Sequence, residues 1–105
     1  MTDQEFIREI AQGNKDAFTA LYTQYRSEFI GYMRKRYKGD PDTIVDLYQE
    51  SCIVLYDRIC SGKLHTLNPG AKLKTYLFKV GNNKLIDLIR KGVRIGTVEN
   101  IGFRL

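Results

Sequence analysis

Four consecutive segments of this chain place apolar residues at three- and four-residue intervals, and each is bounded by a capping residue or a glycine. Such spacing gives a helix one apolar face to bury, whereas strand alternation is hard to find. The segments begin at Thr2, Asn14, Asp40 and Leu73 and end near Gly13, Gly39, Cys60 and Lys91. The pattern therefore predicts an all-α fold, a compact bundle of about four helices.

Side chains at three of the expected helix starts support these boundaries. Thr2 and Glu5 have the spacing of a capping box, in which each side chain satisfies a free backbone N–H group of the other. Asn14 is a favourable N-cap. Asp40 followed by Pro41 supplies a cap and then proline at the first helical position. Three helix starts are thus predicted from local chemistry alone.

The remaining segments are a loop and a tail. Residues 61–71 contain a strong turn signal at Asn68-Pro69-Gly70. Gly81 inside the last expected helix costs about 1 kcal/mol relative to alanine, and a small residue there often lets another helix approach closely. We expect one helical domain over residues 1–92, followed at 93–105 by a tail or the start of an interdomain linker.

Composition excludes several classes of protein. The chain has 105 residues, of which 43% are hydrophobic and 28% charged, as in one folded domain. The longest apolar run, Cys52 to Tyr56, has five residues, whereas a membrane helix needs about twenty. The polar, acidic N-terminus is unlike a secretory signal. We expect Cys52 and Cys60 to be free, mostly buried thiols of a cytoplasmic protein.

The sequence contains no recognisable catalytic motif. The sequence has no glycine-rich phosphate loop and no nucleophile signature. His65 is the one histidine and has no obvious base partner. Cys60 and His65 alone do not make a structural zinc site, which needs four ligands. We therefore expect a protein that is not an enzyme and that needs no metal or cofactor.

The formal net charge of +5 is unevenly distributed. Residues 1–62 carry eight basic and ten acidic side chains, whereas residues 63–105 carry nine basic and two acidic ones. A basic C-terminal part favours a polyanionic partner, above all nucleic acid. The alternative is a solvated lysine-rich face that binds no ligand.

The last loop and helix combine residue types that suit unpaired nucleic acid. Cations neutralise phosphates, aromatic rings stack on unpaired bases, and asparagine amides hydrogen-bond to base edges. The residues concerned are Lys72, Lys74, Tyr76, Phe78, Lys79, Asn82, Asn83, Lys84, Arg90, Lys91 and Arg94. Tyr76 and Phe78 lie about 200° apart around a helix, so both cannot face one side, and the alternative is that at least one belongs to the core.

A second surface is an acidic stripe on the third expected helix. Asp46, Gln49 and Glu50 share one face, and Asp57 lies close to the same azimuth. No lysine or arginine stands four residues from Asp46 or Glu50 to neutralise them within the helix. An acidic stripe on a basic protein favours a basic protein partner. A solvated helix face is the alternative.

Three blocks between Gly13 and Arg94 resemble region 2 of bacterial RNA polymerase sigma factors of the extracytoplasmic function group. They are NKDAFTALYTQY at 14–25, DLYQE at 46–50 and TYLFKVGNNKLIDLIR at 75–90, in the family's order and spacing. Two positions depart from the family pattern. Tyr76 stands where the family usually has tryptophan, and Asn82 where an arginine commonly precedes the conserved asparagine.

The resemblance implies a role for each surface. The family's Asp-Leu-x-Gln-Glu helix docks on the clamp coiled coil of the polymerase β′ subunit, which carries over to Asp46, Gln49 and Glu50. Its last loop and helix recognise the −10 promoter element, help to open the duplex and capture a flipped non-template base. The expected DNA-binding residues are Lys72, Lys74, Tyr76, Lys79, Asn82, Asn83, Arg90 and Lys91.

The resemblance also implies partners and a location. These are RNA polymerase core, the non-template strand of the −10 element and an anti-sigma factor, all in the bacterial cytoplasm. From the residues themselves we expect no membrane insertion, because no apolar run is long enough, and a monomeric free state, because the exposed faces are charged. Family members normally continue into a region 4 domain that reads the −35 element, and we expect that domain to be absent here. Two alternatives stay open: a helical DNA-binding regulator that acts without polymerase, and a protein-interaction module without DNA function.

Overall fold

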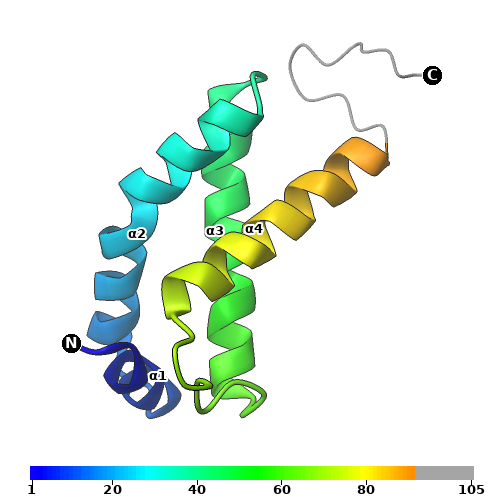
Figure 1. Ribbon diagram of the computed structural model, residues 1–105. Helices are drawn as coiled ribbons and strands as arrows, with labels where there is room; N and C mark the ends of the chain where they lie inside the picture. The colour runs from blue at the N-terminus through cyan, green and yellow to red at the C-terminus, as the bar shows by residue number, and fades with distance from the viewer. Residues whose placement is uncertain (92–105) are drawn as a thin grey trace.

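The computed structural model describes residues 1–91, which contain four α-helices and the loops that join them (Figure 1). The helices are α1 (Asp3–Ala11), α2 (Lys15–Arg36), α3 (Pro41–Cys60) and α4 (Leu73–Arg90). The prediction of an all-α bundle of about four helices is confirmed. None of these helices is long and apolar enough to cross a membrane. The expectations for Arg94 and for the tail at 93–105 lie outside the described residues.

Side-chain caps begin the first three helices as expected. Thr2 Oγ1 accepts a hydrogen bond from the backbone N–H of Glu5 at 3.1 Å, and Glu5 Oε1 accepts one from the Thr2 N–H at 2.7 Å. The hydrogen bond from the Thr2 N–H stabilises the Glu5 carboxylate and lowers its pKa. The side chains of Asn14 and Asp40 each accept from backbone N–H groups of the following turn. All three capping predictions are confirmed.

The ends of the helices follow the sequence less closely. Gly13 and Gly62 come after α1 and α3 with φ values of 88° and 83°, a left-handed conformation that favours glycine. Helix α2, however, ends at Arg36, so the prediction that Gly39 ends it is wrong. The next residue, Tyr37, adopts an extended conformation, and its side chain is buried. The helix therefore ends where this side chain enters the core, three residues before Gly39.

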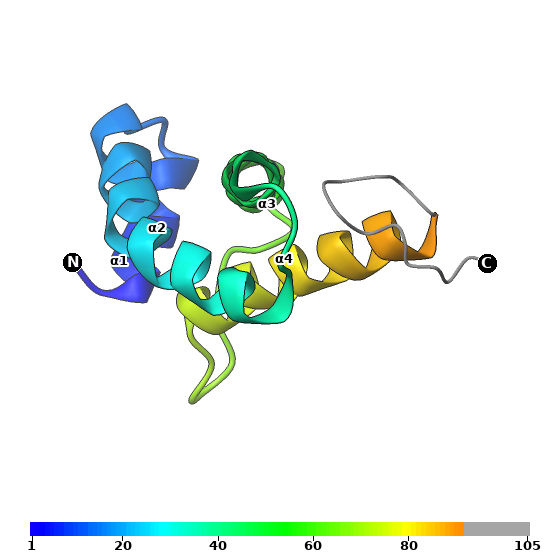
Figure 2. The same ribbon diagram turned by 90° about the horizontal axis from the view of Figure 1, so that it is seen from above.

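Helix α3 packs against each of the other three helices. Helix α1 lies at the end of the molecule where α2 begins and α3 ends (Figure 1). Helix α4 crosses α3 obliquely, and its C-terminal half extends beyond the other helices (Figure 2). Ile86 and Ile89, in that half, are accordingly exposed.

Helices α2 and α4 meet where Gly81 faces the ring of Phe29. A Cβ atom on Gly81 would lie 2.5 Å from two ring atoms of Phe29 and 3.0 Å from Cε of Met33. Phe29 also packs on Tyr48, with ring centroids 4.8 Å apart, and the Tyr48 hydroxyl donates to the carbonyl oxygen of Tyr22 at 2.6 Å. The prediction that glycine in the last helix permits a close approach is confirmed.

The two cysteines of α3 differ in exposure. Both are free, but Cys52 is buried and Cys60 is exposed. Burial raises the pKa of the Cys52 thiol to about 11. The expectation of buried thiols therefore holds for Cys52 and is wrong for Cys60, which lies at the last residue of the helix, where the chain leaves the core.

Candidate nucleic-acid and protein interfaces

The acidic stripe of α3 is a solvent-exposed helix face. Asp46, Gln49, Glu50 and Asp57 are all exposed, and Ile53 lies among them with 55% of its surface accessible. The opposite face of α3 supplies core residues. The structure thus brings the predicted docking residues together, as the helical period requires.

One member of the stripe has a cationic partner on another helix. Lys84 Nζ of α4 lies 3.7 Å from Glu50 Oε1, and both side chains are partly exposed. An exposed ion pair of this kind contributes roughly 0–1 kcal/mol, so an incoming partner can displace it. Asp46 forms no ion pair with any residue of the described range 1–91.

A small hollow lies beside the stripe between α2 and α3. Its volume is about 300 Å³, and it is lined by Phe18, Tyr22, Gln49, Cys52 and Ile53. Two aromatic rings and an isoleucine make this hollow mainly apolar. The face therefore offers apolar contact area next to its carboxylates, a combination common at protein interfaces.

A larger groove of about 620 Å³ runs between α3 and α4. Four of the expected DNA-binding residues line it: Tyr76, Lys79, Asn83 and Arg90. The groove also holds Arg58 and Lys84, against one carboxylate, Asp87. Its charge is therefore net positive, and the aromatic ring and the amide lie among the cations.

The groove includes Arg58, a residue that was not among those expected to bind DNA. Arg58 of α3 donates a hydrogen bond from Nη1 to the Tyr76 hydroxyl at 2.6 Å, and its guanidinium carbon lies 5.8 Å from the centre of the Tyr76 ring. Arg58 is the one basic residue of α3, and this isolated cation on an otherwise acidic helix is the feature of the sequence that could have indicated it. Its proximity to Tyr76 depends on the crossing of α3 and α4.

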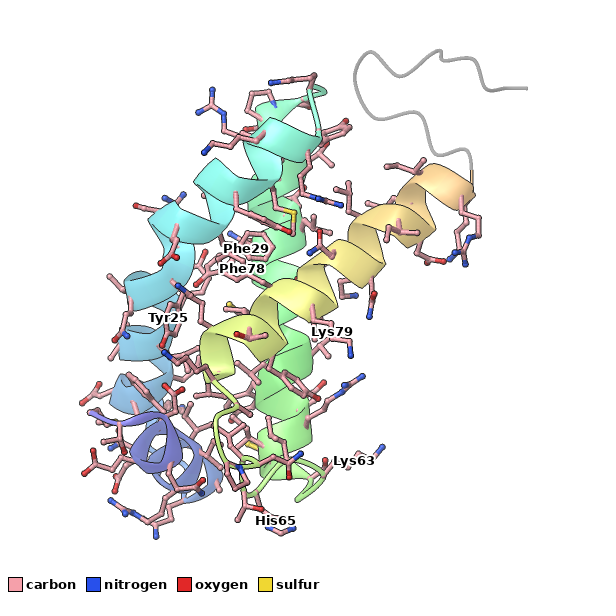
Figure 3. The ribbon with its side chains drawn as sticks, viewed as in Figure 1. Tyr25, Phe29, Lys63, His65, Phe78 and Lys79 are labelled. Carbon is pink, nitrogen blue, oxygen red and sulfur yellow. The ribbon has the colours of Figure 1, made fainter. Side chains whose placement is uncertain are left out.

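Phe78 and Asn82 lie on the other side of α4, towards α2. Figure 3 shows Phe78 directed between α2 and α4, whereas Lys79 projects from the opposite side of the helix. The Phe78 ring packs on Phe29 and Tyr32, with centroids 5.3 Å apart in both pairs. Asn82 Nδ2 donates to the Tyr32 hydroxyl at 3.2 Å. Asn82 is thus directed away from the groove, and the expected separation of Tyr76 from Phe78 is confirmed.

Two of the expected DNA-binding lysines take part in ion pairs. Lys74 Nζ lies 2.6 Å from Glu28 Oε2 of α2, and this hydrogen bond raises the pKa of Lys74. Lys91 Nζ lies 3.1 Å from Asp87 Oδ2 one turn earlier. Both pairs are exposed, so each can open to a phosphate at little cost.

The loop between α3 and α4 presents mostly exposed side chains at the end of the molecule where α1 lies. Leu64 is buried and anchors it, while Lys63 and His65 point outward (Figure 3). The N–H of Ala71 donates to the Asn68 carbonyl at 2.9 Å, and Gly70 has φ of 83°. The predicted turn is confirmed. Lys72 follows it, exposed, immediately before α4.

Comparison with known protein families identifies a related family. A model of the Sigma-70 region 2 family matches residues 21–95. The matched range contains most of α2, all of α3 and α4 and the loop that joins them, and so both surfaces described above. Helix α1 precedes the match. No curated protein and no solved structure matches the chain.

Proposed function

This chain belongs to the sigma-70 region 2 family, whose model matches more than half of its residues, and on that premise we propose that it docks on the β′ clamp of bacterial RNA polymerase and reads the −10 element as a non-template single strand. Region 2 of this family is a non-catalytic domain of transcription initiation. The observation that carries the proposal is the juxtaposition of two unlike surfaces. The acidic stripe and the cationic groove share α3 and meet at the Glu50–Lys84 pair.

The stripe supplies the contacts to polymerase. Asp46 and Glu50 provide exposed carboxylates for basic residues of the clamp, and Gln49 provides an amide between them. The hollow beside Ile53 takes an apolar side chain of the same partner. Charge complementarity of this kind favours fast association and the correct register.

The groove supplies the contacts to DNA. Lys79, Arg90 and Arg58 neutralise phosphates, and the ring of Tyr76 offers a stacking surface for an unpaired base. Asn83 is placed to hydrogen-bond a base edge. Lys72, Lys74 and Lys91 extend the positive charge beyond the groove, and Asn82 supports the surface through its bond to Tyr32.

Strand opening then needs no catalysis by this domain. Unstacking a base costs a few kcal/mol, and stacking on an aromatic side chain contributes about 1–3 kcal/mol per base. A surface that binds unpaired bases better than paired ones shifts the duplex towards the open state. The polymerase carries out the chemistry.

The wider biological assignment is also part of the proposal. The domain belongs to the extracytoplasmic function group, acts in the bacterial cytoplasm, is monomeric when free and is held inactive by an anti-sigma factor. The three sequence blocks that resemble this group support the assignment.

Titration with labelled DNA tests the DNA half of the proposal. The probes are a twelve-nucleotide single strand, randomised at its six central positions, and the duplex of the same pool. The parent chain is compared with Lys79→Ala/Asn83→Ala and with the matched control Gln12→Ala/Lys15→Ala, which removes the same kinds of side chain away from the groove. We expect the parent to prefer the single strand, the groove variant to lose about tenfold in affinity for it, and the control to change little.

Two results would contradict this half of the proposal. Tighter, salt-sensitive binding to the duplex would favour a regulator that acts without polymerase. Equal losses in the groove variant and the control would mean that general charge, rather than the groove, binds the DNA.

A further inference from the structure

Two polar side chains in the first turn of α1 bind the backbone of the segment that precedes and begins α4. Asp3 Oδ2 accepts a hydrogen bond from the N–H of Leu73 at 2.9 Å. Gln4 Nε2 donates to the carbonyl of His65 at 2.8 Å, and Gln4 Oε1 accepts from the N–H of Leu67 at 3.4 Å. These three bonds join parts of the chain that are more than sixty residues apart.

Asp3 takes the place of the local capping side chain that α4 lacks. The residue at the N-cap position, Lys72, makes no side-chain cap hydrogen bond, and the first turn of α4 contains no acidic residue. The Asp3 carboxylate satisfies one of the free N–H groups of that turn and places a negative charge at the positive end of the helix dipole. The start of α4, which leads to Tyr76 and Lys79, is therefore fixed by α1.

Gln4 fixes the loop in the same way. Its single amide binds the backbone on both sides of Thr66, so it sets the path of the chain from His65 to Leu67. The rest of the loop is held by the burial of Leu64 and by the turn at residues 68–71. Without Gln4, no side chain of residues 1–91 binds the backbone of residues 65–67.

Helix α1, which carries both residues, is anchored to the rest of the fold by its apolar face. Phe6, Ile7 and Ile10 are each at most 2% exposed, so its apolar face is fully docked. The capping box at Thr2 and Glu5 orders the turn that carries Asp3 and Gln4. Both residues lie outside the family match at 21–95, so the match itself assigns them no role.

We propose that Asp3 and Gln4 are positioning residues that hold loop 61–72 and the first turn of α4 in the conformation that distinguishes one unpaired base from another. The inference rests on the proposed function. It assigns neither residue a contact with DNA. Removal of Gln4 changes base selectivity, because the loop loses its position. It leaves the salt dependence of binding unaltered, because Gln4 is uncharged.

The first readout needs no DNA. Amide hydrogen exchange is measured by NMR on the full chain for Gln4→Ala, Asp3→Ala and Asp3→Asn. The matched controls are Gln12→Ala and Asp16→Ala, which truncate a glutamine and a first-turn aspartate whose side chains make no hydrogen bond to this loop. We expect exchange about fivefold faster at Leu67 in Gln4→Ala and at Leu73 in Asp3→Ala, with protection retained in the controls. Asp3→Asn keeps an acceptor oxygen and should rescue most of the protection at Leu73.

The second readout is base selectivity. Dissociation constants are measured for the single strands dT12, dC12 and dA12 at several salt concentrations. We expect Gln4→Ala to reduce about fivefold the ratio of the dissociation constants of the weakest- and the tightest-binding strands, without changing how affinity depends on salt concentration. Gln12→Ala should leave this ratio unchanged.

Unchanged exchange at Leu67 and Leu73 would overturn the inference, because the contacts would then hold nothing in place. Faster exchange with an unchanged ratio would overturn it too, because the loop would be loosened without effect on base reading. A parent chain that binds none of the three strands would contradict the proposed function, and the inference with it. Failure of the proposed function is distinguishable from failure of this inference alone, because it appears in the parent chain, whereas the other two outcomes appear only in the variants.

Discussion

Arg58 and Tyr76 bind each other across the groove between α3 and α4. The guanidinium donates to the tyrosine hydroxyl at 2.6 Å and also lies 5.8 Å from the centre of the ring. Both contacts restrict the tyrosine ring, and they leave the cation in the groove beside Lys79 and Arg90. An aromatic ring and a cation are thereby placed next to each other by two different helices.

Substitutions at this pair should separate charge from stacking. Arg58→Ala should lower the slope of log affinity against log salt concentration by about one phosphate contact, whereas Arg58→Lys should preserve it. Tyr76→Phe keeps the ring and should change single-strand affinity little, whereas Tyr76→Ala should cost about 1–3 kcal/mol per stacked base. Anisotropy titrations over a range of salt concentrations measure both. An unchanged slope in Arg58→Ala would remove Arg58 from the DNA surface.

Alanine at two helical glycines should have opposite effects on stability. A Cβ atom on Gly31 would meet nothing within 4 Å beyond its own helix backbone, so Gly31→Ala should stabilise the protein by about 1 kcal/mol through helix propensity. Gly81→Ala gains the same propensity but forces a methyl group against Phe29, and overpacking of this kind costs about 1–3 kcal/mol. Urea unfolding gives both free energies. If Gly81→Ala stabilises as much as Gly31→Ala, the close approach of α2 and α4 is wrong.

The cysteines should differ in reactivity towards thiol reagents. Because Cys52 is buried and its pKa is about 11, its thiol stays protonated near pH 8, and only the thiolate is a good nucleophile. We expect a maleimide to label the exposed Cys60 in the folded protein and to reach Cys52 only after unfolding. Mass spectrometry of Cys60→Ala and Cys52→Ala identifies the labelled site. Rapid labelling of Cys52 in the folded chain would contradict its burial.

The same burial predicts a loss of stability in alkali. The folded pKa of Cys52 lies above its ordinary value of 9.0, so its contribution is fully present below about pH 9 and is lost as pH rises towards 11. Burial also raises the pKa of Tyr48, which acts in the same direction at higher pH. Unfolding free energies from pH 8 to 11 should fall less steeply in Cys52→Ala than in Cys60→Ala. Equal slopes would contradict the prediction.

The helix starts were predictable because they depend on neighbours in sequence. The caps at Thr2, Asn14 and Asp40 each bind backbone groups two or three residues away. The cap of α4 comes instead from Asp3, seventy residues earlier. No local pattern contains that information, because it depends on how α1 docks against the rest of the fold.

The two surfaces were predictable to different degrees for the same reason. The acidic stripe lies on one helix, so the helical period alone brings Asp46 close to Glu50. The same period separates Asn82 from Asn83 by about 100° around α4. The two asparagines were both expected to bind DNA, but this angle already indicates that they face different sides of the helix. The cross-helix partners, Lys84 for Glu50 and Arg58 for Tyr76, follow only from the crossing of α3 and α4.

The central claim, that the α3 stripe docks on RNA polymerase, is tested most directly by co-migration with bacterial core polymerase in gel filtration. The parent chain is compared with Asp46→Lys/Glu50→Lys and with Asp16→Lys/Glu28→Lys, which makes the same change in net charge on α2. Unfolding curves establish that all three are folded.

We predict that the parent and the α2 control co-migrate with core polymerase and that the stripe variant does not. A folded stripe variant that co-migrates as well as the parent would contradict the account.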